Sequence, residues 1–399
     1  MRPATACLIA AMGLFAAVPA SAQPSVKVGV LTDLSGAYAD LSGPGSVVAA
    51  KLAAADFMAA NKGFTVEVVA GDHLNKADTA TTIARQWFDR DGVDVIADVP
   101  NSAAALAVNE VSREKKRVFL DSGAGTADLT GSRCSPYTVH WTYDTWALAH
   151  GTAEAMVGQG GNTWFFITAD YAFGHAMERD ASAVVVAAGG RVLGQVSYPF
   201  PSSDFSSTLL QAKTSGAKVI GLANGGADLI NAIKQAGEFG ITQGGQALAG
   251  LVVFISDVHA LGTQTAQGLV LTEAFYWDHD EATRAWSKRF TAQDGGTMPT
   301  MMHAGVYSSL MHYLAAVRDA GSKDAGPVMA KMRDTKVHDP LFGDGEVRAD
   351  GRVTHPMYLF RVKTPAQSKG PWDLYEMLAT IPATDAFRPL AEGGCAASK

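Results

Sequence analysis

Three loops in the first third of the sequence carry small polar side chains that suit an anionic ligand. The first covers residues 32–41 and contains Ser35, the second holds Asn101 and Ser102, and the third covers residues 122–126. Each loop follows a predicted strand and precedes a predicted helix. Amides and hydroxyls at a helix N-terminus stabilise a negative charge such as a carboxylate. Each side chain alone could merely cap its helix, but three such loops at neighbouring strand ends favour a shared pocket.

Aromatic and polar residues follow the strands predicted further along the chain. Tyr171 and Phe173 come after one strand, Asn224 after another and Asp257 after a third. Aromatic rings in a cleft offer apolar area together with a polar group. Further aromatic residues lie where the chain would pass from one lobe to the other, and packing between the lobes is their alternative role. They are Trp141, Tyr143, Tyr276 and Trp277.

Motifs for covalent, metal or phosphate chemistry are missing from the sequence. It contains no G-x-S-x-G elbow, no H-E-x-x-H, no P-loop and no C-x-x-C, and none of its 10 histidines lies three or four residues from another. A secreted hydrolase that uses Asp257 or His303 as its base remains the enzymatic alternative. We expect a protein that is not an enzyme and that needs no cofactor or metal.

Composition limits the class of protein. The chain has 399 residues, a formal net charge of −7, 47% hydrophobic residues and 18% charged residues. This length and apolar content predict a globular protein of about two domains rather than a disordered chain. A net acidic chain lacks the basic face that nucleic-acid binding needs, so we expect no nucleic-acid partner.

The N-terminus resembles an export signal. Arg2 precedes an apolar run over residues 4–18, and an Ala-x-Ala site ends at Ala22. A membrane anchor is the alternative, but the run is too short for the roughly 30 Å of bilayer hydrocarbon. We therefore predict that residues 1–22 are a signal peptide and that the mature protein is periplasmic, without membrane insertion.

Export changes the interpretation of the cysteines. Cys7 lies in the predicted signal peptide, which leaves Cys134 and Cys395. Two cysteines in an oxidising compartment predict a disulfide bond, with two free buried thiols as the alternative. The bond would attach the C-terminal tail to the first third of the chain.

Two successive blocks, residues 26–120 and 145–255, alternate short apolar runs with helical periodicity. Near-continuous apolar strands are typical of parallel sheets that are covered on both faces. The expected fold class is therefore α/β, with two Rossmann-like, doubly wound lobes.

The last part of the chain does not form a third such block. It reads as helices over 281–293 and 304–320, followed by a hairpin over 342–362 with its turn at 349–352. These elements would complete the two lobes, which requires the chain to cross between lobes more than once.

The order of several segments resembles the periplasmic solute-binding proteins of ABC importers, in the Leu/Ile/Val-binding or type I group for branched-chain amino acids. The resemblance implies two lobes joined by a three-crossover hinge. Lobe 1 would be 23–141 and 275–353, lobe 2 would be 142–274 and 354–385, and the tail 386–399 would return to lobe 1. The segments that carry the resemblance are VKVGVLTDLSGAYADLSGPGSVVAAKLA, GVDVIADVPNSAAALAV, KRVFLDSGAGTADLTG, DYAFGHAMERDA, YPFPSSDFSSTLLQAKTSGAKVIGLAN and AGVYSSLMHYLAAVRDAG.

The resemblance also implies roles for individual residues. Asn101 and Ser102 match the family's serine-bearing carboxylate loop. Ala124 and Gly125 match the loop that supplies a backbone amide and a threonine hydroxyl, although Gly125 holds the threonine's place and Thr126 comes one residue late. Leu41 matches a pocket-lining aromatic residue of the family, and Phe173 matches a tyrosine that contacts the ligand ring. Asp257 matches the acid that pairs with a ligand ammonium.

These features predict a monomeric receptor that captures a small carboxylate by hinge closure and delivers it to an inner-membrane ABC permease. The altered threonine position counts against an ordinary α-amino acid, and the whole chain resembles a subgroup associated with aromatic or other small carboxylates. We therefore rank an aromatic carboxylate first, an aliphatic amino acid second, and urea or a short amide third. A sensory solute receptor is a third class of function, and it would need a separate membrane partner.

Overall fold

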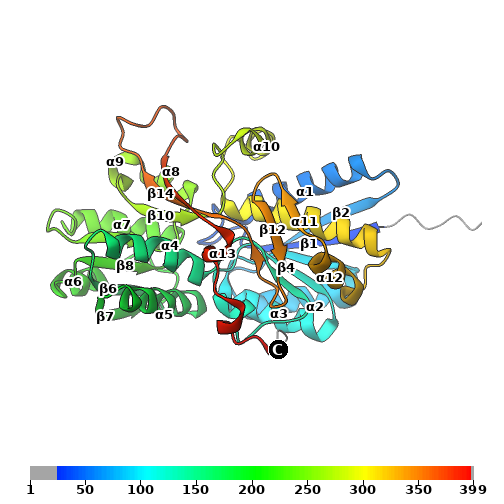
Figure 1. Cartoon of the computed structure of the whole chain (residues 1–399), viewed down its shortest axis with the longest axis horizontal. Helices are drawn as coiled ribbons and strands as arrows, with labels where there is room; N and C mark the ends of the chain where they lie inside the picture. The colour runs from blue at the N-terminus through cyan, green and yellow to red at the C-terminus, as the bar shows by residue number, and fades with distance from the viewer. Residues whose placement is uncertain (1–24, 397–399) are drawn as a thin grey trace, which may run out of the picture.

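The computed structural model describes residues 25–396. The predicted signal peptide lies outside the described residues. Two parallel sheets lie side by side in Figure 1, the first in blue and cyan and the second in green. The first sheet has the strand order β2-β1-β3-β4-β5. Its strands are β1 (Ser25–Thr32), β2 (Thr65–Asp72), β3 (Val95–Asp98), β4 (Val118–Asp121) and β5 (Thr138–His140).

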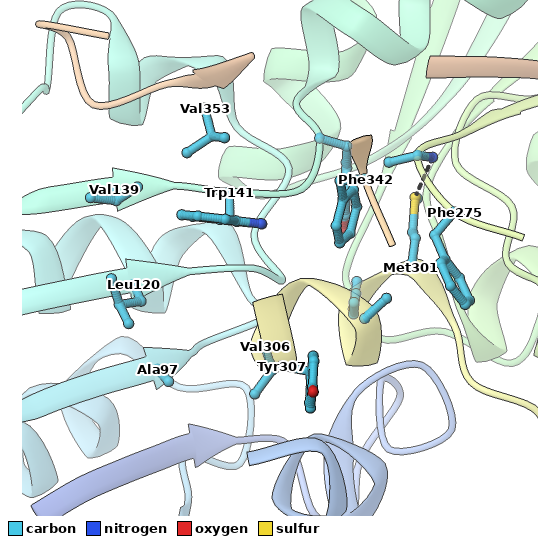
Figure 2. Close-up of a cluster of buried hydrophobic side chains, with 14 of the residues drawn as sticks. Ala97, Leu120, Val139, Trp141, Phe275, Met301, Val306, Tyr307, Phe342 and Val353 are labelled. Atoms are coloured by element: carbon cyan, nitrogen blue, oxygen red, sulfur yellow. Dashed lines mark hydrogen bonds between the residues drawn. The ribbon is translucent and has the colours of Figure 1, made fainter. Parts of the chain in front are cut away.

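Helices cover both faces of the first sheet because its strands alternate apolar side chains between the two faces. Ala97 joins the core beneath one pair of helices, whereas the adjacent Ile96 joins the core beneath the other pair. Figure 2 shows the first of these cores, which contains Leu120 and Val139 of the sheet and Val306 of α11. The two pairs are α1 (Gly43–Ala60) with α11 (Met301–Ala320), and α2 (Ala77–Gln86) with α3 (Ser102–Lys115).

The second sheet has the strand order β7-β6-β8-β9, with all neighbours parallel. Its strands are β6 (Thr163–Ala169), β7 (Arg191–Tyr198), β8 (Val219–Ala223) and β9 (Ala247–Gly250). The helices of this part are α4 (Thr145–Gly158), α5 (Ala172–Ala187), α6 (Ser206–Thr214), α7 (Ala227–Glu238), α8 (Ile255–Leu261) and α9 (Thr263–Ala266). We call the first sheet with its helices the first lobe, and the second sheet with its helices the second lobe.

The rest of the chain completes both lobes. An antiparallel sheet of β10 (Val270–Glu273), β14 (Met357–Val362) and β15 (Tyr375–Ile381) packs against α4 of the second lobe. The chain passes between the lobes after β5, after β10 and after β13. The elements that join the first lobe are α10 (Glu281–Thr291), α12 (Ala325–Asp334), β11 (Val337–Asp339), β12 (Gly343–Val347) and β13 (Val353–Thr354). The remaining short helices are η1 (Trp87–Asp91), η2 (Ala127–Thr130), α13 (Ala383–Ala386) and η3 (Leu390–Glu392).

This architecture confirms the expected fold class of two doubly wound α/β lobes. The predicted hairpin over 342–362 is wrong in extent. Its turn does join β12 to β13, where Val347 pairs with Val353, but β14 pairs with β10 and β15 instead. The residue at which each lobe begins stays a prediction.

The C-terminal tail returns to the first lobe. A disulfide joins Cys134 to Cys395, which are 261 residues apart. The Arg388 guanidinium donates a hydrogen bond of 3.0 Å to the Ala127 carbonyl of the same lobe. No helix in the described part of the chain is long and apolar enough to cross a membrane.

Candidate functional site

A small cavity lies between the lobes, at the carboxyl ends of the parallel strands. This is the place where open α/β sheets bind ligands. No charged side chain lines the cavity within the described residues. The lining consists of Tyr38, Leu41, Pro100, Gly125 and Met302 from the first lobe, Tyr143 from the first crossover, and Tyr171, Phe173, Gly225, Val252 and Phe254 from the second lobe.

The two lobes meet directly beside this cavity. Tyr38 of the first lobe and Tyr171 of the second share a hydrogen bond between their hydroxyls. Phe200 stacks on both rings, with centroids 5.3 Å from Tyr38 and 4.7 Å from Tyr171. The Ala227 N–H at the start of α7 donates a 3.2 Å hydrogen bond to the Ala37 carbonyl. The structure is therefore that of a closed pair of lobes.

Gly226 allows this close approach. Its φ of +61° lies in the left-handed region that favours glycine. A β-carbon at this position would lie 2.5 Å from the Ala37 carbonyl oxygen and 3.0 Å from the Tyr38 ring. A side chain here would keep the two lobes apart.

Gly125 plays a similar part within the cavity. A β-carbon there would lie 2.6 Å from Phe173 and 3.4 Å from Tyr143. The glycine therefore lets the Phe173 ring of the second lobe cover this loop of the first. The threonine expected from the family pattern would not fit beneath that ring without displacing it.

The polar residues of the first-lobe loops mainly hold the loops together. The Asn101 amide oxygen accepts from the N–H groups of Ala103 at 3.0 Å and Ala104 at 3.1 Å, as a helix cap does. The Ser102 hydroxyl accepts from the Thr126 N–H at 3.2 Å.

Two backbone N–H groups of the same loops lack hydrogen-bond partners among the described residues. Among the described residues, no hydrogen-bond acceptor faces the N–H of Ser102, the first residue of α3, or the N–H of Gly125. Ala124 differs, because its N–H donates to Asp121 at 3.0 Å and its carbonyl binds His140 at 2.7 Å. Two N–H groups at the first-lobe side of the cavity are thus available to an anion.

Asn224 directly follows β8 and precedes Gly225, which lines the cavity. The residue is 1% exposed, and neither atom of its amide has a hydrogen-bond partner in the part of the chain that the structure describes. A buried amide without partners is costly. The amide therefore offers a donor and an acceptor close to the cavity.

Five of the eleven predicted site residues line the cavity, and they are Leu41, Gly125, Tyr143, Tyr171 and Phe173. Ser35 and Asp257 are among the six that do not. The Ser35 hydroxyl is exposed and donates to Asp72 at 2.8 Å. The buried Asp257 carboxylate accepts from the Phe254 N–H at 2.9 Å, which caps α8, and burial raises its pKa to about 7. Val252 and Phe254, rather than Asp257, reach the cavity from this segment.

Sequence reasoning missed several lining residues. Tyr38 lies in the first polar loop but was not singled out. Val252 and Phe254 fall at the end of the second predicted block, 145–255, and lie in the loop between the end of β9 at Gly250 and the start of α8 at Ile255. The one signal for this loop was Asp257, an acidic residue suited to the first turn of a helix.

The comparisons identify the family. The family model described as "Periplasmic binding protein" matches residues 25–371. A periplasmic binding protein from Burkholderia mallei is 52% identical, with a TM-score of 0.92, over 94% of this chain and 99% of that one. The chain belongs to the periplasmic binding protein family. This binding protein is the solute-binding component of a periplasmic ABC transport system and is not an enzyme.

Other relatives differ in what their names say they bind. A branched-chain amino acid ABC transporter ligand-binding protein from Burkholderia xenovorans is 42% identical, with a TM-score of 0.83, over 94% of this chain and all of that one. The Leu/Ile/Val-binding protein homolog 6 of Brucella melitensis is 27% identical, over 89% of this chain and 92% of its own. Solute-binding proteins from R. palustris share the fold at 23% and 20% identity and hold 4-hydroxybenzoate and benzoate. The expected resemblance to the Leu/Ile/Val-binding group is therefore confirmed.

Proposed function

We propose that this binding protein captures a small aromatic carboxylate in the cavity between its lobes and delivers it to an inner-membrane ABC permease. The observation that carries the proposal is the cavity lining, which is aromatic and aliphatic and holds no charged side chain among the described residues. An aromatic ring fits such walls because both surfaces leave water on binding. The N–H groups of Ser102 and Gly125 would hold the carboxylate on the first lobe.

An α-amino acid fits this lining less well. Its ammonium group needs a carboxylate or several acceptors, because a buried charge without partners is costly. Asp257 is the acid that the family pattern offers, and its carboxylate already caps α8. An amino acid therefore remains the second candidate, in keeping with the names of the Burkholderia xenovorans and Brucella relatives.

Capture would proceed by hinge closure. Phe173, Val252 and Phe254 of the second lobe would cover a ligand already held by the first lobe. Only the closed conformation offers both sets of contacts, so the ligand stabilises that conformation over the open one. Asn224 would then face the part of the ligand furthest from its carboxylate.

The proposed function requires export of the protein to the periplasm. Cleavage after Ala22 would release a mature protein into the periplasm, where Cys134 and Cys395 can stay oxidised. We propose that it works as a monomer, the state that the family resemblance implies.

Calorimetry with matched ligands tests the proposal. Phenylacetate and phenylglycine share a ring and a carboxylate, and they differ in the amino group. We expect phenylacetate and benzoate to bind and to raise the unfolding temperature, while phenylglycine and leucine bind at least tenfold more weakly. Tighter binding of the amino acids would overturn the aromatic carboxylate assignment. A signalling role instead of transport would be revealed if deletion of the gene left uptake of radiolabelled benzoate by whole cells unchanged.

A further inference from the structure

Two buried carboxyl groups lie directly behind the loops that would hold the ligand carboxylate. Asp98 ends β3 and Asp121 ends β4, and the two residues are paired in register on neighbouring strands. Both are 0% exposed. The loops that follow them supply Pro100 and Gly125 to the cavity. The pair therefore lies between the first-lobe core and the ligand site.

The two carboxyl groups have different surroundings. Asp121 accepts hydrogen bonds from the Gly123 and Ala124 N–H groups at 3.3 and 3.0 Å. One oxygen of Asp121 also lies 3.3 Å from His140, and the buried guanidinium of Arg352 is near enough to oppose the rise in its pKa. Burial and the negative charge of Asp98 nevertheless raise the pKa of Asp121 well above that of an ordinary carboxyl, so these contacts do not make Asp121 the charged member of the pair.

Asp98 has no such support. Neither of its oxygens makes a well-aligned hydrogen bond within the described residues. Three neutral hydroxyls lie closest to it, those of Thr32, Ser42 and Ser46, and they only partly offset the burial that raises the Asp98 pKa to about 6.

The ionisable groups around Asp98 add no positive charge. Asp121 on the neighbouring strand is itself acidic, and the negative charge of Asp98 raises the Asp121 pKa, so a charge on one acid opposes a charge on the other. From α11, His303 binds the Ser42 carbonyl at 2.8 Å, and burial lowers its pKa to about 4, so it is neutral. His140 on β5 is buried beside Asp121, and its pKa is also lowered by burial.

The backbone at Asp98 is strained. Asp98 has a φ of 79° and Val99 a φ of 67°, values that residues with a β-carbon rarely adopt. This bend directs the Asp98 carboxyl toward the third polar loop, because its Oδ1 lies 2.8 Å from the position of a β-carbon on Gly123. The structure thus holds the acid close to the loop that contains Gly125.

The two acids act electrostatically on Tyr143, a residue of the cavity lining. Tyr143 lines the cavity and donates a 2.5 Å hydrogen bond to the Gly123 carbonyl. Negative charges on Asp121 and Asp98 add to the burial that raises the pKa of the Tyr143 hydroxyl. A ligand carboxylate on the N–H groups of Ser102 and Gly125 would add a further negative charge to the same water-poor region, where like charges repel strongly.

We propose that Asp98 holds a proton in the ligand-bound state, so that capture of each carboxylate takes up a proton from solvent. This inference rests on the proposed function. The protonated Asp98 removes one of the charges that oppose the ligand, and its O–H becomes a donor to the neighbouring hydroxyls. Asp98 thereby favours anionic ligands without contributing a positive charge.

The pH dependence follows from linkage. Without ligand the Asp98 pKa is about 6, and the ligand anion raises it further. Well below pH 6 the group is already protonated, so affinity does not change with pH. Above that value binding takes up a proton, and affinity falls by at most about tenfold per pH unit for one linked proton. Aromatic acids have a pKa near that of other carboxylic acids, roughly 4, and stay ionised in this range.

Calorimetry of benzoate binding in two buffers of different ionisation enthalpy measures the proton uptake directly. We expect uptake approaching about one proton per benzoate near pH 7 and almost none near pH 5. The Asp98→Asn variant keeps the shape without the charge, so it should bind benzoate with no uptake and more tightly than the native protein near pH 8. Glu67→Gln is the matched control, because Glu67 is an exposed acid paired with Lys27 on the edge of the sheet.

The outcomes separate the two proposals. Binding of benzoate without proton uptake by the native protein would overturn the proton linkage and leave the aromatic carboxylate assignment intact. Failure of benzoate and phenylacetate to bind at any pH would overturn that assignment and this inference with it. The measurement on the native protein needs no variant, so it decides the matter even if Asp98→Asn does not fold.

Discussion

The Tyr38 hydroxyl on one lobe is hydrogen-bonded to the Tyr171 hydroxyl on the other, and both rings line the cavity. This bond exists only when the lobes are closed. Tyr171→Phe should therefore weaken the binding of phenylacetate by about fivefold, the value of one hydrogen bond near 1 kcal/mol. Calorimetry measures the affinity, and small-angle scattering measures the compactness of the ligand-bound protein.

Tyr198→Phe is the matched control for that variant. The Tyr198 hydroxyl donates to Asp228 at 2.9 Å, and both residues belong to the second lobe. This substitution should lower the free energy of unfolding without weakening ligand binding to the same degree. Equal losses of affinity in both variants would argue against a role of Tyr171 in closure.

Gly226→Ala should impair closure. The new methyl group would lie 2.5 Å from the Ala37 carbonyl, a contact made only between closed lobes. We expect affinity to fall more than tenfold, which is about 1.4 kcal/mol. Gly268→Ala controls for backbone strain, because Gly268 has a φ of +83° with no neighbouring atom within 4 Å. A similar affinity for both variants would contradict the prediction.

Gly125→Ala should displace the Phe173 ring, which lies 2.6 Å from the position of the new methyl group. Binding of aromatic acids should weaken about tenfold as the ring leaves the ligand, a cost near 1.4 kcal/mol. Combining Gly125→Ala with Phe173→Leu should restore part of the affinity, because the smaller side chain makes room. Additive losses in the double variant would indicate that the two residues do not interact.

Asp257→Ala should reduce stability rather than ligand binding. Removal of the cap at Phe254 costs about 1 kcal/mol of unfolding free energy, as does Asp280→Ala at the start of α10. Denaturant unfolding compares the two variants, and calorimetry with phenylacetate should show nearly native affinity. If Asp257 paired with a ligand ammonium, its loss would instead abolish the binding of leucine.

Cys395→Ser should free the C-terminal tail. Loss of the link to Cys134 should lower the free energy of unfolding by about 2 to 5 kcal/mol. Affinity for the ligand should change little, because neither cysteine lines the cavity. Thermal unfolding with and without reductant checks the result, since reductant should destabilise the native protein and leave the variant unaffected.

The lobes were predictable because buried parallel strands have a simple signature. Within the second predicted block, 145–255, the apolar run over residues 219–223 forms β8. The stretch that follows it forms α7, which ends at Glu238. Each lobe, and the need for the chain to cross between lobes more than once, could therefore be inferred from local patterns, whereas the three-crossover hinge came from the family resemblance.

The cavity was harder to predict for a physical reason. A ligand that is mostly apolar is held by residues such as Val252 and Phe254, which have the same chemistry as the core. The sequence analysis selected polar residues as ligand contacts instead. The Asn101 side chain, however, caps one helix and the Asp257 side chain caps another. Which apolar residues meet at the cleft depends on the closed arrangement of the lobes, and no local pattern contains that information.

The disulfide gives the molecule a fourth covalent connection between its lobes. The segment after β15 leaves the sheet beside the second lobe and ends at Cys395, which is bonded to Cys134 in the first. Together with the three crossovers, it means that a protease cutting any one connection leaves both halves attached. A nicked molecule would therefore migrate as a single intact species on a denaturing gel without reductant.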